Sequence, residues 1–454
     1  MSATLQLRSF VGVSSGRFPG LAIWACSVAA GFSAFAFVDA PRGILFAALG
    51  IGALLLLLYP ELALALYVVI GDLKGDDRIG SLLPLDLTLA LGTILVAGVV
   101  LNLLRGKPIR RMPGIYFLFL ALVVLMTASL AYTPVFDAGL EKLGRFVSVT
   151  AVVIVAPFFV LGTSLSVDRF FISFGLAAFS ICAWSLFSLG GAARLATPSD
   201  NTIGLGHIAC ALILIIWFGV IPRWEFPKRL FVYPLLAVPG IALIGSGARG
   251  PAIACGAVIL ASLFFGRGRW LDVGCFALIG IAALPFLKLP ASSLEYLGTL
   301  IRSRSTAELL DFRGDLLASA WQLLQKHPLI GGGIQSFRYY SPNPGVYNWP
   351  HNIFLEIACE LGIPAALMVS AIFASAIRES LRQLKNQAVS RVALARLTAA
   401  LLAVGIINGT NTGDINSDRL TWLFLSLAFV LGSPPVQSAG LPLPYTREPQ
   451  AVET

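Results

Sequence analysis

Apolar runs of the length that crosses a lipid bilayer recur along most of this chain, separated by short polar intervals. A transmembrane helix needs about 20 mostly apolar residues, whereas a spanning β-barrel would show shorter segments of alternating polarity. The pattern therefore predicts an all-α fold, a polytopic bundle of about 12–14 transmembrane helices. The expected spans cover residues 20–38, 43–59, 62–73, 87–104, 114–132, 146–164, 170–190, 206–221, 230–247, 251–266, 270–287, 353–376, 397–407 and 420–432.

The longest polar interval, residues 288–350, divides the chain. We expect a transmembrane bundle at 1–287, a loop with short helices at 288–350, further transmembrane helices at 351–432 and a disordered tail at 433–454. Inside the loop, residues 309–325 have the apolar spacing of a helix, which Lys326-His327-Pro328 should end. Gly331-Gly332-Gly333 then predicts a flexible turn.

The distribution of Lys and Arg predicts the orientation of the chain. If the N-terminus is cytoplasmic, four inward-facing intervals hold 14 Lys and Arg residues, and the short outer loops hold fewer. These intervals are 105–111, 223–229, 267–269 and 378–396. Since cytoplasmic loops are enriched in Lys and Arg, the loop 288–350 is expected on the outer face, with both termini inside.

Composition supports a membrane protein and narrows its partners. Hydrophobic residues make up 57% of the chain and charged residues 12%, about half the usual charged fraction. The net charge of +9 is scattered between spans, which favours contact with membrane lipid over nucleic acid. All six cysteines lie in apolar runs and are expected to serve as packing residues. Asp76-Asp77 has no third ligand nearby, so a solvated turn is favoured over a metal site.

The sequence Trp349-Pro350-His351-Asn352 stands where the polar loop ends and an apolar run begins. An imidazole can take a proton near neutral pH, so His351 is a candidate general base at the membrane surface. The alternative is that His351 merely caps the helix that enters the membrane.

Arg249 lies in a short turn between two apolar spans and is flanked by Gly247 and Gly250. A charge at such a depth is costly unless it is paired or functional, and a guanidinium matches a diphosphate in charge and geometry. The alternative is an arginine that extends from a helix end to the interface.

Several motifs occur in the order found in one known family. His351-Asn352, nine residues and then Gly362-Ile363-Pro364-Ala365 resembles a signature of the bacterial O-antigen ligase and O-antigen polymerase family. The Ser246–Gly250 turn, the helix that carries Arg313 and the position of Asp414 are similar to that family too. Ala365 departs from the residue usual in ligases, which favours a polymerase.

The resemblance implies a C-type glycosyltransferase-like enzyme of the bacterial inner membrane, without metal or other cofactor. It would move a glycan from undecaprenyl diphosphate to an acceptor hydroxyl. Arg249 and Arg313 would bind the diphosphate, and His351 would act as the base, with inversion at the sugar. Nearby cations should lower the pKa of His351. Further substrate contacts are expected from Asn352, Asp414, Arg419 and Ser246.

Other interpretations stay open at this point. Asp414 either orients the imidazole or forms an ordinary turn. Asn201, Lys142 and Arg145 are weaker candidates on the outer face. A polytopic transporter of lipid-linked glycans is the rival function, and a non-catalytic assembly subunit is a third. The acceptor is lipid A-core, another repeat of the same glycan, or a protein hydroxyl.

Overall fold

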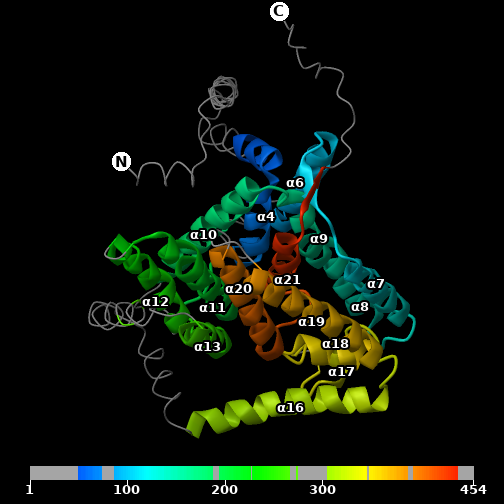
Figure 1. The fold of residues 1–454 in the computed structure, drawn as a ribbon. Coiled ribbons are helices and arrows are strands. Elements are labelled where there is room, and N and C mark those ends of the chain that lie inside the picture. The colour runs from blue at the N-terminus through cyan, green and yellow to red at the C-terminus, as the bar shows by residue number, and fades with distance from the viewer. Residues whose placement is uncertain are drawn as a thin grey trace, which may run out of the picture.

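The computed structural model is an all-α bundle with one small pair of strands (Figure 1). It describes residues 50–73, 86–187, 194–225, 228–265, 272, 274, 304–344, 347–386 and 392–437, and the expected spans 20–38 and 270–287 lie outside or almost outside this set. The longer helices are α4 (Pro60–Val69), α6 (Leu87–Leu104), α7 (Phe117–Ser129), α8 (Phe136–Arg145), α9 (Ala151–Val160), α10 (Ser164–Leu186), α11 (Thr202–Leu214), α12 (Ala237–Gly245), α13 (Arg249–Phe265), α16 (Arg304–Lys326), α18 (Ile353–Leu361), α19 (Ile363–Asn386), α20 (Val392–Asn411) and α21 (Arg419–Gly432). Short helical turns are η1 (Ile70–Asp72), η2 (Gly114–Tyr116), η3 (Phe146–Thr150), η4 (Ile215–Val220), η5 (Ile221–Arg223), η6 (Lys228–Phe231), η7 (Tyr233–Leu236) and α17 (Phe337–Tyr340).

Among the described residues, seven helices are long and apolar enough to cross a membrane, or eight if one bent pair counts as a span. One of them is α6, whose bounds equal the predicted span 87–104, and its first turn is capped by Asp86. Another is continuous from Phe136 to Val160, since η3 joins α8 to α9. The bent pair is Gly50–Leu58 and Pro60–Asp72, which meet at 112°. The prediction of a polytopic helical protein is therefore confirmed.

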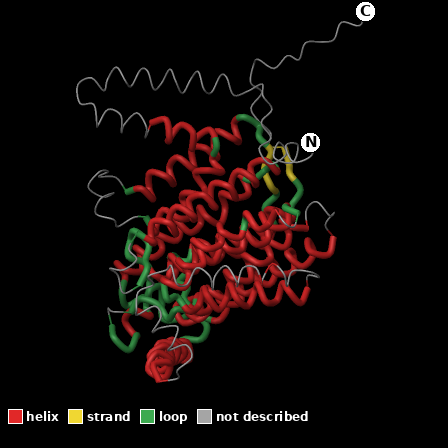
Figure 2. Tube along the Cα trace, turned by 90° about the vertical axis from the view of Figure 1, so that its left-hand side faces the viewer, coloured by secondary structure: helices red, strands yellow, loops and turns green. Residues whose placement is uncertain are grey.

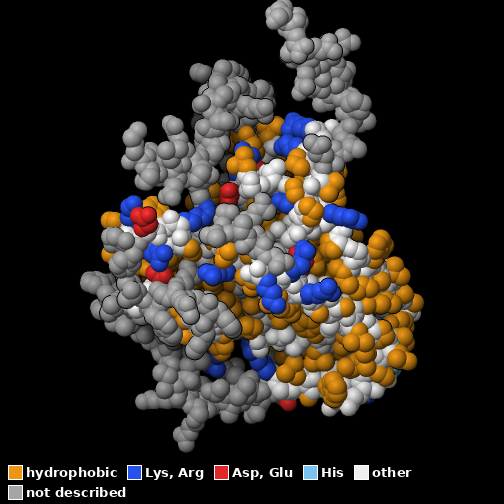
Figure 3. All heavy atoms as spheres, viewed as in Figure 1, with side chains coloured by type: hydrophobic (Ala, Val, Ile, Leu, Met, Phe, Trp, Pro, Cys, Tyr) orange, Lys and Arg blue, Asp and Glu red, His pale blue; other side chains and the backbone are white. Residues whose placement is uncertain are grey.

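The centre of the bundle is α21, which lies between α9, α19 and α20 (Figure 1). Almost every side chain of α21 from Leu420 to Val430 is buried. Trp422 is fully buried and makes edge-to-face or tilted ring contacts with Phe119 and Phe373. By contrast, the outer face of the bundle over α7, α8 and α19 is covered with hydrophobic side chains (Figure 3). An apolar exterior of this kind suits a lipid surrounding.

The two ends of the bundle differ in structure (Figures 1 and 2). At one end, β1 (Pro108–Arg110) pairs antiparallel with β2 (Pro435–Gln437), and Arg110 Nη1 donates a hydrogen bond to the Ser433 carbonyl. At the opposite end, α16 lies across the bundle. The predicted disorder of the tail is therefore wrong for its first residues, because backbone pairing with β1 orders them. The rest of the tail lies outside the described residues.

The predicted span 353–376 is wrong as a single helix. It divides at Gly362 into α18 and α19. Gly362 has a φ of +89°, and a Cβ atom there would lie 2.2 Å from the Leu329 carbonyl oxygen. The turn after α16 packs against this break, since Ile363 donates its backbone N–H to the Pro328 carbonyl. The glycine is required by this close approach, which no local pattern reveals.

Helix α16 and the turn after it pack against α18. The predicted helix at 309–325 is confirmed as α16, which buries Leu316, Ala320 and Leu323 against Ala358 and Cys359 of α18. We expected the glycine run after α16 to be a flexible turn, and this prediction is wrong. Gly332 and Gly333 donate backbone hydrogen bonds to the Cys359 and Glu360 carbonyls. The four cysteines that the structure describes are buried and unbridged, as predicted for packing residues.

Candidate functional site

His351 lies in the loop just before α18, with an unusual backbone and two ring contacts. Its φ is +57°, a left-handed conformation that costs a residue other than glycine about 1–2 kcal/mol. Its Nδ1 accepts a hydrogen bond from Trp349 Nε1 at 3.2 Å, and the imidazole also hydrogen-bonds to the Thr412 backbone. Because Nδ1 accepts a hydrogen bond, the neutral ring carries its hydrogen on Nε2, which donates to the Thr412 carbonyl. The ring is therefore held between two partners.

The surroundings of His351 favour the neutral imidazole. Burial lowers the pKa of His351 below its ordinary value. The bond to the Thr412 backbone opposes this shift, the charge of Arg313 adds to it, and the Asp414 carboxylate opposes it. The predicted direction is thus confirmed, but burial is the largest cause and not the neighbouring cations. A half-buried imidazole that stays neutral at neutral pH can accept a proton.

Thr412, at the end of α20, brings the Arg249 turn to the same place. A Cβ atom on Gly250 would meet Thr412 Cγ2 at 3.1 Å, so the backbone of Gly250 lies close to the Thr412 side chain. The Thr412 hydroxyl also hydrogen-bonds to His207 Nε2 at 3.0 Å. The structure therefore gathers the turn around Arg249, the side chain of His207 and the ring of His351 around one threonine. Sequence spacing could not reveal Thr412, because α11, α13 and α20 meet only in the folded bundle.

Ser246 and Gly247 determine the conformation of the turn that precedes Arg249. Ser246 is fully buried, donates its hydroxyl to the Leu243 carbonyl and accepts the Ala248 N–H. Gly247 has a φ of +64°, which reverses the chain after α12. Arg249 then begins α13, and its Nε and Nη2 atoms are shielded from solvent. Ser246 thus shapes this turn, and its contact with substrate stays a prediction.

The charges of Arg313, on α16, and of Asp414, after α20, change the pKa of His351 in opposite directions. Arg313 is exposed near the middle of α16. Asp414 is buried, and its Oδ1 accepts the backbone N–H groups of Asn416 and Ser417. Asp414 therefore forms a turn, and its role in orienting the imidazole stays a prediction.

The other predicted substrate residues have structural partners. Asn352, not His351, caps α18, because its Oδ1 accepts the Leu355 N–H at 3.0 Å. The capping alternative for His351 is thereby removed. Arg419 lies away from His351, where its Nη1 donates to the Tyr67 carbonyl at 3.2 Å. Asn201 Nδ2 donates to Asp72 Oδ1 at 3.1 Å in the same region.

A buried ionic network between α8 and α18 was not predicted. Lys142 Nζ lies 2.5 Å from Glu356 Oε1 and 2.7 Å from Glu360 Oε2, and all three side chains are buried. Glu356 also accepts the Ile415 N–H, and Glu360 accepts the Gln335 N–H. The signal in the sequence was two glutamates one helical turn apart in an apolar run, which require a partner. In the described part of the chain, no three His, Cys, Asp or Glu side chains form a group that could hold a metal ion.

Comparison with known proteins agrees with the motifs. Residues 234–370 match a family model described as O-antigen ligase. The match contains Arg249, Arg313 and His351 and ends before Asp414, and it confirms the family resemblance. No curated protein matches the chain.

Proposed function

We propose that this chain, which carries an O-antigen ligase domain at residues 234–370, is a glycosyltransferase that uses a polyprenyl-diphosphate-linked glycan. The donor is a glycan on undecaprenyl diphosphate, and the acceptor is a hydroxyl at the outer face of the bacterial inner membrane. The observation that carries this proposal is the half-buried His351, which a left-handed backbone holds between Trp349 and Thr412. Strain of this kind persists where surrounding contacts enforce it, which is common at functional sites.

The reaction follows from the placement of these groups. His351 takes the proton of the acceptor hydroxyl through Nδ1, after the hydroxyl replaces the Trp349 N–H. The acceptor oxygen then bonds to the anomeric carbon, while the bond from that carbon to the diphosphate oxygen breaks. The electron pair leaves on undecaprenyl diphosphate, and in-line attack inverts the sugar. Arg249 and Arg313 stabilise the charge that grows on the diphosphate.

The rival function, a transporter of lipid-linked glycans, would place charges at broken helices near the membrane centre. Here Arg249 begins α13, His351 lies in the loop before α18 and Asp414 follows α20, whereas Arg313 is exposed near the middle of α16. The prediction that no metal takes part also belongs to this proposal, and chelation tests it.

The proposed base is tested with substitutions at His351. We expect His351→Ala in proteoliposomes to lower the transfer rate by roughly two to four orders of magnitude, the usual contribution of a general base. His351→Asn keeps a hydrogen-bonding side chain but cannot take the proton, so its rate should be equally low. His327→Asn is the control, because His327 is exposed in the turn after α16. Full activity of His351→Asn would contradict the role of base.

A further inference from the structure

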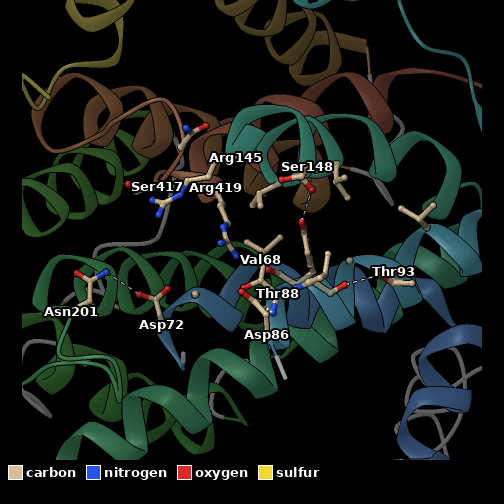
Figure 4. A pocket seen from close by; sticks show the side chains of 18 of the residues that line it. Val68, Asp72, Asp86, Thr88, Thr93, Arg145, Ser148, Asn201, Ser417 and Arg419 are labelled. Carbon is tan, nitrogen blue, oxygen red and sulfur yellow. Dashed lines mark hydrogen bonds between the residues drawn. The ribbon is translucent and has the colours of Figure 1, made fainter. Parts of the chain in front are cut away.

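A pocket of about 1030 Å³ lies among α4, α6, η3 and the start of α21 (Figure 4). Neither Arg249, Arg313 nor His351 lines it. One short segment joins the two places, because Thr412 touches His351 whereas Asn416, Ser417 and Arg419 line the pocket. The reaction proposed above involves no residue that lines this pocket.

The polar end of the pocket has balanced charge. Asp72 and Asp86 face it together with Arg145 and Arg419, and Asn201 adds an amide. Asp72 accepts from Asn201, and the Arg419 guanidinium is fixed on the Tyr67 carbonyl. Two carboxylates beside two guanidinium groups disfavour a free phosphate, because its charge would meet both attraction and repulsion. Rigid donors and acceptors of both kinds suit the hydroxyl groups of a sugar.

The pocket continues into an apolar hollow. A second cavity of about 300 Å³ between α6 and α9 shares Val96 and Val152 with the first. Its walls are apolar and include Val99, Val155 and Phe159. Val96 is 50% exposed on the surface of a candidate membrane span. The groove therefore runs from polar residues at the start of α6 to an apolar wall along the rest of the helix.

We propose that this groove binds a glycolipid, with its sugar among Asp72, Asn201 and Arg419 and one hydrocarbon chain along Val96 and Phe159. The polar head and apolar wall match the two parts of such a molecule. The role of this glycolipid as the acceptor rests on the proposed transferase function, whereas its binding in the groove does not.

The groove is tested by photolabelling the full chain in phosphatidylcholine vesicles. The probe is a monoglucosyl diacylglycerol with a diazirine in one acyl chain, and phosphatidylcholine with the same chain is the comparison. We expect the glycolipid to label peptides from α6 and α9 about fivefold more than the comparison lipid, a difference of the size that one net hydrogen bond supplies. Val96→Trp fills the groove and should remove this preference.

Val124→Trp is the matched control, because Val124 is 59% exposed on α7 and lines neither cavity. It should leave the labelling of α6 and α9 unchanged. Equal labelling by the two lipids, or labelling that Val96→Trp does not reduce, would overturn the proposal. Labelling requires no glycan transfer, so a chain that binds the glycolipid but transfers nothing would refute the proposed function alone.

Discussion

At the scale of single residues, neighbouring residues fix both the backbone conformation and the ring orientation of His351. Pro350 precedes it and Asn352 caps α18 after it, so the strained backbone of His351 has no role in ending or starting the helix. Its ring has one hydrogen-bond partner on each side, Trp349 and Thr412. Such a histidine is fixed in one tautomer and is kept neutral by burial, as a base that works near neutral pH requires.

Replacing the indole tests this arrangement. A hydrogen bond donated to Nδ1 stabilises the neutral imidazole and so lowers the pKa of His351. Below that pKa the imidazolium cannot accept a proton, and the transfer rate falls. Trp349→Phe removes the donated bond, so the acid limb of the pH profile of kcat/KM, which reports the free enzyme, should move upward by roughly half to one pH unit. Trp321→Phe is the control, because Trp321 is 55% exposed on α16. An unchanged limb, or one moved to lower pH, would contradict the contact.

The sequence predicted His351 and Arg249 because their residue types are reactive or costly at a membrane surface, whereas Arg313 was predicted from the family resemblance alone. It could not find Thr412, which contributes backbone and a hydroxyl and has no distinctive chemistry of its own. It also assigned Asn352 and Ser246 to substrate, since polar side chains at a helix end look the same whether they bind a ligand or cap the helix.

At the scale of elements, the network around Lys142 connects α8 to α18. Glu356 and Glu360 place two carboxylates on one face of α18, and each also accepts a backbone N–H from another segment. One of these segments contains Gln335, after α16, and the other contains Ile415, beside Asp414. The network therefore sets the positions of the elements that carry Arg313, His351 and Asp414.

Loss of the central cation should destabilise this arrangement. Lys142→Met leaves two buried carboxylates without their partner, so the free energy of unfolding should fall by about 3–5 kcal/mol. Arg145→Met is the control one turn later, because Arg145 pairs with Glu141 and both side chains are mostly exposed. That exposed pair should contribute about 0–1 kcal/mol. Thermal unfolding in detergent compares the two variants, and equal stability would show that the network is not structural.

The bounds of elements were predictable where the pattern is local. The apolar run of α6 and the apolar spacing of α16 gave both helices, and Asp86 and Pro328 mark their limits. The division at Gly362 was not predictable, because it depends on the turn after α16 packing against α18. The pairing of Pro435–Gln437 with Pro108–Arg110 joins segments from distant parts of the chain and leaves no periodic signal.

At the scale of the whole molecule, α16, which carries Arg313, and one basic interval, residues 105–111, lie at opposite ends of the bundle. The loop with α16 crosses one end, and the strand β1, within the basic interval 105–111, lies at the other (Figures 1 and 2). Because Lys and Arg are enriched in cytoplasmic loops, this separation favours an outer position for His351 and Arg313. The groove along α6 and α9 would then open toward lipid on the side of the bundle.

The central proposal is that the chain breaks the bond between glycan and diphosphate instead of moving the intact lipid. The most direct measurement follows undecaprenyl diphosphate released from a labelled undecaprenyl-diphosphate-linked glycan in liposomes that contain the purified chain, an acceptor glycolipid and excess EDTA. We expect release that requires the acceptor, continues under chelation and falls by about 10²–10⁴ in His351→Ala. Labelled lipid that crosses the membrane intact, with no diphosphate released, would contradict the proposal and establish a transporter. Release that stops under chelation and returns with Mg²⁺ would contradict the metal-independent reaction.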